Sequence, residues 1–157
     1  MSWIREQFTE IDLQGLLCRL AEHVKAFHGL TPAEISDLLG RSEKCTYAPG
    51  VCIVKEGNIG AHMYIILSGD ARVLKTGREG EVELAVLAPA DSFGEMALAD
   101  KEARSASVVA DTDCVLVRID DQAIHARPET GLKVYRNIAK VLSARLRTAD
   151  ELLAWRL

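Results

Sequence analysis

The segment Phe93-Gly94-Glu95-Met96-Ala97-Leu98, followed by Arg104-Ser105-Ala106, is the most informative part of this 157-residue chain. Its glycine lets the backbone approach an anion closely, and a helix that starts there offers free N–H groups to that anion. An arginine stands nine residues after the glutamate. Arginine pairs bidentately with phosphate oxygens, and a carboxylate accepts a hydrogen bond from a ribose hydroxyl. The segment therefore predicts a pocket for a small sugar phosphate.

Short stretches typical of β-strands lie on both sides of this segment. Glycine, proline and asparagine residues separate apolar runs, which predict strands at 51–54, 62–68, 71–75, 82–87, 103–109 and 114–118. Strands this short and this closely spaced are typical of an antiparallel β-roll that is closed or nearly closed.

The residues before the strands have a helical pattern. Apolar residues recur at helical spacing within 9–40, at Ile11, Leu13, Leu16, Leu17, Leu20 and Val24. Thr31 is the predicted N-cap of a second helix, since Pro32 follows it and Glu34 completes a capping box. Gly40 is the predicted end of that helix.

The helical pattern returns after the last strand. Asp120-Asp121 predicts the start of a short helix, and Pro128 opens a longer one that runs towards Leu157. This longer helix carries a broad apolar stripe, made of Val134, Ile138, Val141, Leu142, Leu146, Ala149, Leu152, Leu153 and Trp155. A stripe of that width can cover the β-roll with one edge and meet a second copy of the chain with the other.

Composition predicts one globular domain and narrows the function classes. The chain is 48% hydrophobic and 27% charged, with no apolar run long enough to span a bilayer and no signal peptide, so we expect a cytoplasmic protein without membrane contact. A net charge of −4 argues against a nucleic-acid partner. The basic residues of the last helix are interpreted as a solvated face (Arg136, Lys140, Arg145, Arg147 and Arg156). The four scattered cysteines are expected to be reduced.

Taken together, these features resemble the cyclic-nucleotide-binding domains of bacterial catabolite activator proteins and protein kinase A regulatory subunits. The resemblance covers roughly residues 27–157 and includes Phe27-His28-Gly29-Leu30, Gly57, Gly69, the segment 93–106 and the terminal helix. It implies a mainly β fold with flanking α-helices: an antiparallel double-stranded β-helix, or jelly-roll-like β-roll, with N-terminal helices and a C-terminal lid helix. The expected division is 1–26 helical, 27–127 β-roll and 128–157 lid.

The resemblance also assigns roles in the pocket. Glu95 is expected to hold the ribose 2′-hydroxyl and Arg104 the exocyclic oxygens of a cyclic phosphate. The rest of the segment supplies backbone N–H groups or close contacts, from Phe93, Gly94, Met96, Ala97, Leu98, Ser105 and Ala106. The expected base pocket is formed by Val73, Ala85 and Leu87, and the lid residues that reach the base are Arg145 or Thr148, with Trp155 as a stacking cap or, equally, an interface residue.

The ligand implied is cAMP in preference to cGMP, in a non-enzymatic regulatory domain without metal or catalytic cofactor. A homodimer through the terminal helix and a downstream protein partner are expected. The chain ends at Leu157, so we expect no DNA-binding module after the lid. One alternative is a degenerate scaffold that no longer binds nucleotide. Another is a cupin-like metalloenzyme, whose metal site would need clustered ligands. The four histidines of this chain are isolated in the sequence (His23, His28, His62 and His125).

One position departs from the family pattern. The Gly-Asp pair usual before the phosphate segment is Ala90-Asp91 here. If this turn requires positive φ, alanine costs about 1 kcal/mol there. Either the turn differs or the strain is tolerated.

Overall fold

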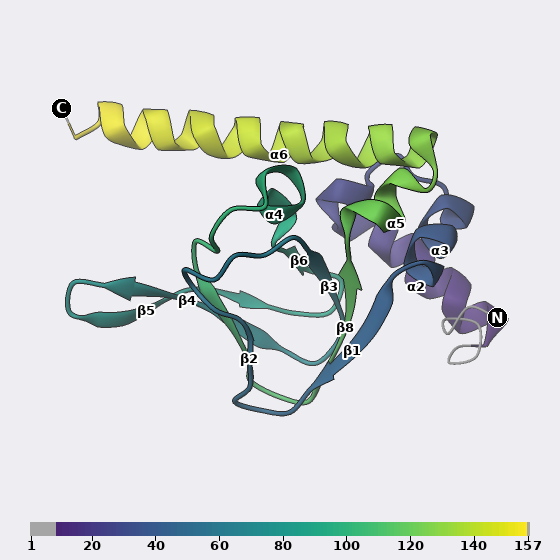
Figure 1. Ribbon diagram of the computed structural model, residues 1–157, viewed down its shortest axis with the longest axis horizontal. Helices are drawn as coiled ribbons and strands as arrows, with labels where there is room; N and C mark the ends of the chain where they lie inside the picture. Colours follow the sequence, from purple (N-terminus) through teal and green to yellow (C-terminus); the bar gives the residue numbers. More distant parts are fainter. Residues whose placement is uncertain (1–8, 157) are drawn as a thin grey trace.

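A computed structural model describes residues 9–156 and shows two antiparallel sheets that form a roll, with the N-terminal helices at one end and the long C-terminal helix running along one side (Figure 1). One sheet has the order β1-β8-β3-β6 and the other the order β2-β7-β4-β5. The strands are β1 (Glu43–Tyr47), β2 (Cys52–Val54), β3 (Met63–Ser68), β4 (Ala71–Gly77), β5 (Gly80–Leu87), β6 (Ser92–Phe93), β7 (Ser107–Ala110) and β8 (Cys114–Ile119). The predicted antiparallel β-roll with flanking helices is confirmed.

Three details of the strand prediction were wrong. Strand β1 was missed because its sequence, EKCTY, is mostly polar and lies at a sheet edge, where alternation is weak. Strand β6 was missed because it has two residues. The strand predicted from Ala103 starts at Ser107, since Ala103 forms only an isolated bridge with Ile59.

The helices are α2 (Glu10–His23), the 3₁₀ turn η1 (Lys25–Phe27), α3 (Pro32–Gly40), α4 (Glu95–Asp100), α5 (Asp121–His125) and α6 (Pro128–Ala154). The predicted capping box is present: the Thr31 hydroxyl accepts from the Glu34 amide at 3.2 Å, and the Glu34 carboxylate accepts from the Thr31 amide at 2.8 Å. Helix α6 ends at Ala154, before the predicted Leu157, which lies outside the described residues. Within residues 9–156 no helix has the length and apolar character needed to cross a membrane.

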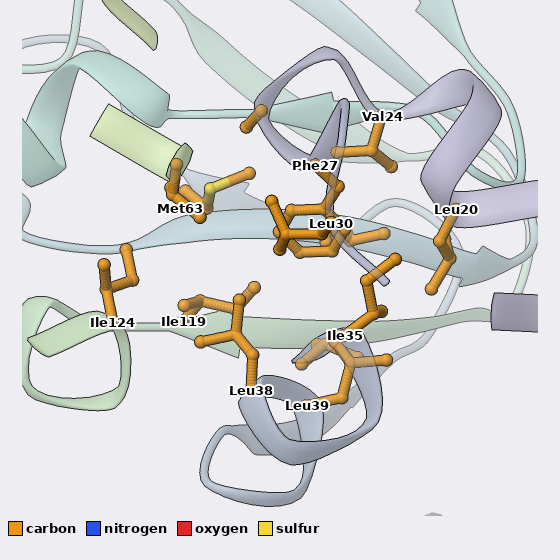
Figure 2. Close-up of a cluster of buried hydrophobic side chains, with 14 of the residues drawn as sticks. Leu20, Val24, Phe27, Leu30, Ile35, Leu38, Leu39, Met63, Ile119 and Ile124 are labelled. Atoms are coloured by element: carbon orange, nitrogen blue, oxygen red, sulfur yellow. The ribbon is translucent and has the colours of Figure 1, made fainter. Parts of the chain in front are cut away.

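Strand β3 separates two hydrophobic cores. Met63 and Ile65 pack against the helices, and Tyr64 and Ile66 point into the roll, because successive side chains of a strand face opposite sides. In the first core, side chains of α2, η1 and α3 meet those of β3, β8 and α5 (Figure 2). Both faces of β3 are therefore buried, so the strand is an almost continuous apolar run.

The turn before the phosphate segment keeps its alanine in a left-handed conformation. Ala90 has φ 73° and donates its N–H to the Ile66 carbonyl at 2.8 Å, while Ile66 donates to the Asp91 carbonyl at 2.9 Å. The turn therefore has the positive φ that glycine would favour, and the fold tolerates a strain of about 1 kcal/mol.

Candidate ligand-binding site

The phosphate segment turns sharply between a strand and a short helix. Phe93 pairs with Tyr64 in the sheet, and their rings stack with centroids 5.0 Å apart. Gly94 is the N-cap of α4 with φ 78°, a conformation that glycine adopts without strain. A side chain there would also meet the His62 carbonyl at 2.9 Å. This glycine therefore allows both the turn and the close approach of neighbouring groups.

The Arg104 side chain lies in the space left by two glycines. A Cβ atom on Gly60 would lie 2.2 Å from its Nε, and one on Gly94 would lie 2.5 Å from its Nη1. Nη2 donates to the His62 carbonyl at 2.9 Å and Nη1 to the Gly94 carbonyl at 3.4 Å. The guanidinium carbon is 5.9 Å from the centre of the Tyr64 ring. Main-chain carbonyls and an aromatic ring thus orient this cation.

No ion pair formed by the described residues includes Arg104. Burial lowers the pKa of its guanidinium, because desolvation disfavours a charged group. A cation that is partly desolvated and has no carboxylate beside it is suited to receive an anion.

Glu95, the first residue of α4, is only 7% exposed. Its Oε1 accepts a hydrogen bond from Arg145 Nη2 of α6 at 2.8 Å. The carboxylate expected to bind a ribose hydroxyl is therefore paired with a cation of the predicted lid helix.

Glu95, Arg104 and Arg145 line one cavity of about 120 Å³, together with the start of α4 and the loop after it. The structure brings Gly94, Glu95, Met96, Ala97, Arg104, Ser105 and Arg145 to this cavity. Two other members of the segment, Phe93 and Leu98, are buried in the cores, and Ala106 is partly buried beside Ser105.

The predicted base pocket lies on β4 and β5. Val73 is opposite Ala85, and Ala71 is opposite Leu87. Val73 and Leu87 pack against the core inside the roll, whereas Ala85 is exposed. A register shift between Val73 and Leu74 places Leu84 in a bulge, which explains why alternation could not select one face of 82–87. None of the three predicted residues lines the 120 Å³ cavity.

Of the three predicted lid residues, only Arg145 reaches the cavity. The Thr148 hydroxyl donates to the Ala144 carbonyl one turn earlier, and Thr148 lines a groove between η1 and α6 instead. Trp155 is 89% exposed at the far end of the helix. Base contacts from Thr148 and Trp155 stay predictions for a different position of α6.

The family model described as cyclic nucleotide-binding domain matches residues 44–127, more than half of the chain. The chain belongs to the cyclic nucleotide-binding domain family. The cyclic AMP receptor protein of Thermus thermophilus is 38% identical over 125 residues, which are 79% of this chain and 58% of that protein. The cGMP-dependent protein kinase of Toxoplasma gondii is 41% identical over 96 residues, which are 61% of this chain and 9% of the kinase.

The crystal structure of the Thermus thermophilus catabolite activator protein superposes with a TM-score of 0.76 at 37% identity, over 83% of this chain and 62% of that one. The chain thus spans 58% of the length of the receptor protein it resembles. These relatives share the domain and its roll with this chain, which spans only part of their length.

The residues that hold Arg104 in this domain were not predicted from the sequence. His62 and Gly60 lie in a loop more than forty positions earlier in the chain, and they act through a carbonyl oxygen and through the lack of a side chain. No local pattern in the sequence connects Gly60 or His62 with an arginine so far along the chain.

Among residues 9–156, no group of three or more His, Cys, Asp or Glu side chains has the arrangement needed to hold a metal ion. The geometry therefore gives the cupin-like hypothesis no support, and the site is best described by its anion-binding groups.

Proposed function

We propose that this domain is a regulatory sensor that binds cAMP in preference to cGMP, with Arg104 on the cyclic phosphate and Glu95 on the ribose. One observation carries the proposal: the oriented, partly desolvated Arg104 lacks a carboxylate partner among the described residues. Its contacts with two carbonyls use two of the five N–H donors of a guanidinium. The remaining donors suit the exocyclic oxygens of a phosphate.

The pairing of Glu95 with Arg145 supports a role for α6 as a lid. A ribose hydroxyl that donates to Glu95 competes with the Arg145 guanidinium for the same carboxylate. The ligand then has different affinities for two positions of α6, and binding shifts the equilibrium between them. The cavity has a volume of about 120 Å³ in the arrangement in which Arg145 donates a hydrogen bond to the Glu95 carboxylate.

We also propose that α6 pairs with α6 of a second copy. Leu142, Leu146, Ala149 and Leu153 are spaced alternately by four and three residues, which is the spacing of a coiled-coil seam. Leu146 and Leu153 are 64% and 60% exposed. Arg145 flanks this seam, three residues after Leu142 and four before Ala149. One helix can therefore contact the pocket at the edge of the seam and a partner helix along it.

The preference for cAMP is supported by a relative that is matched over 79% of this chain and whose name describes it as a cyclic AMP receptor protein. The cGMP-dependent kinase is similar over a shorter region. A non-catalytic role and a cytoplasmic location are parts of the same proposal, and a downstream partner is its expected output.

Titration calorimetry with cAMP and with cGMP tests the proposal. Wild-type protein is expected to bind cAMP more tightly than cGMP. Arg104→Ala removes two or more charge-assisted hydrogen bonds to the ligand and is expected to weaken cAMP binding about a hundredfold. Arg104→Lys keeps the positive charge but loses the paired N–H donors of the guanidinium, so its affinity for cAMP is expected to lie between those of the wild type and Arg104→Ala. Arg72→Met is the control, since Arg72 pairs with Asp111 and Glu83 on the outside of β4.

If folded wild-type protein binds neither nucleotide, the sensor proposal is wrong and the scaffold hypothesis replaces it. If Arg104→Ala binds as well as the wild type, the assignment of the phosphate to Arg104 is wrong. If the wild type binds cGMP more tightly than cAMP, only the proposed preference for cAMP is wrong.

A further inference from the structure

The backbone of Arg104 is held by the loop around Gly57. The Gly57 amide donates to the Arg104 carbonyl at 2.9 Å, and the Arg104 amide donates to the Asn58 carbonyl at 2.8 Å. One residue earlier, the Glu56 amide donates to the Ser107 hydroxyl at 2.9 Å. The strand-like segment that carries the arginine is therefore fixed on the side of this loop.

On its other side the same segment is held by a lysine of β4. Lys75 Nζ donates to the Ser105 carbonyl at 2.5 Å and lies 3.2 Å from Glu56 Oε1. The second carboxylate oxygen of Glu56 accepts from the Thr76 amide at 2.9 Å. Glu56 thus joins the loop, the arginine segment and β4 through three groups, and these contacts hold its carboxyl pKa below the ordinary value, chiefly through the Thr76 amide and less through Lys75.

The face of β4 that carries Lys75 also carries Val73, because residues two apart on a strand share a face. Val73 belongs to the expected base pocket and packs against the core inside the roll. The lysine therefore links the hairpin proposed to contact the base with the segment proposed to contact the phosphate.

We propose that Lys75, held by Glu56, is a positioning residue that sets the distance between β4 and the Arg104–Ser105 segment, and so the fit of the cyclic nucleotide between them. This inference rests on the proposed function. The Lys75 and Glu56 side chains are 46% and 27% exposed, so the alternative is a surface ion pair that stabilises the hairpin alone. The contact with the Ser105 carbonyl distinguishes the two possibilities, since it connects the pair to the binding segment.

Lys75→Met keeps the aliphatic stem and removes the ammonium, and it is expected to weaken cAMP binding about tenfold. Lys75→Arg, which can still contact both oxygens, is expected to restore most of the affinity. Arg72→Met is the matched control, because Arg72 lies on the same strand with a side chain 42% exposed but faces Asp111. Arg72→Met is expected to bind cAMP with an affinity within twofold of that of the wild type.

A cycle with Arg104→Lys separates positioning from general stability. If Lys75 acts through the arginine segment, Lys75→Met is expected to weaken cAMP binding by less than about threefold in the Arg104→Lys background. Equal losses in both backgrounds, or binding of Lys75→Met within twofold of the wild type, overturn the inference while the proposed function stands.

If the wild type binds no cyclic nucleotide, the proposed function fails, and amide hydrogen exchange in ligand-free protein decides on the lysine. Faster exchange of the Arg104 and Ser105 amides in Lys75→Met than in Arg72→Met supports the positioning role. Equal exchange in the two variants contradicts it.

Discussion

The two halves of α6 differ in what holds them. In the first half, 128–141, Thr130, Gly131, Val134, Asn137 and Ile138 are buried, and the half packs on η1 and α5. In the second half, 142–154, no residue is buried and Arg145 makes the one polar contact with another element that the described residues show. In Figure 1 this half continues past α4, away from the other helices.

Polar contacts repeat this contrast. The Asn137 amide donates to the carbonyls of Ala26 and His28 at 3.1 and 2.7 Å, and Lys133 contacts both oxygens of the Glu34 carboxylate. None of these groups lines the 120 Å³ cavity. The first half is thus held by burial and by several polar contacts, whereas the second has the Arg145–Glu95 ion pair and the packing of the half-buried Leu142. Under the proposed lid role, α6 is therefore expected to bend or pivot near residue 141.

The largest expected effect compares one apolar truncation in each half. Ile138→Ala leaves a cavity in the core and is expected to reduce the free energy of unfolding by about 2–5 kcal/mol. Leu146→Ala removes an exposed side chain and is expected to change it by about 0.5 kcal/mol or less in a monomer. Urea denaturation of both variants gives the comparison.

The same experiment at several protein concentrations tests the proposed dimer. If the second halves pair, Leu146→Ala lowers stability more at high concentration than at low concentration. Similar losses for both variants in dilute monomeric protein would show that the two halves are equally held, contrary to the contrast drawn above.

A smaller effect is expected from removing the one polar contact of the second half. Arg145→Gln frees Glu95 for the ribose hydroxyl, so cAMP affinity is expected to rise about two- to fivefold. Arg147→Gln is the control, because it removes a nearby exposed cation of the same helix that forms none of the described ion pairs. Calorimetry measures both. A weaker affinity in Arg145→Gln would show that Arg145 binds the ligand instead of competing with it.

The sequence predicted the features that depend on neighbours in the chain. The capping box of Thr31 and Glu34 and the glycine turn and helix start of the phosphate segment involve residues a few positions apart. Strands β3 and β8 were predicted because burial on one or both faces leaves a clear apolar pattern. The family resemblance rested on the same local motif, and the family match confirms it.

Features that depend on contacts between distant residues could not be predicted in this way. Glu95 and Arg145 are fifty positions apart, and Arg104 is held by main-chain carbonyls, which every residue type carries. The bulge at Leu84 shifts the faces of β5, so alternation did not identify which residues of 82–87 point inward. The ligand contacts themselves stay predictions, since the apolar residues on β4 and β5 and those at the end of α6 do not line the 120 Å³ cavity.

The smallest expected effect is a pH dependence of the first half. The Thr31 amide and then the Lys133 ammonium hold the pKa of Glu34 below its usual 4.5. The stability that this carboxylate contributes is complete above that value and is lost as the pH falls through the lowered pKa of the folded state. Because Lys133 and Glu34 are partly exposed, at 42% and 21%, we expect at most about 1 kcal/mol.

Glu34→Gln isolates this contribution, since glutamine can still complete the capping box while losing the charge that attracts Lys133. The difference in unfolding free energy between wild type and Glu34→Gln is expected to be constant near neutral pH and to shrink below pH 4.5. Combined with Lys133→Met in a double-mutant cycle, it gives a coupling of about 0.5 kcal/mol at neutral pH and none in acid. A coupling that persists at pH 3 would mean that Lys133 and Glu34 stabilise the first half by packing. Burial alone would then anchor that half, and the contrast with the single ion pair of the second half would be sharper.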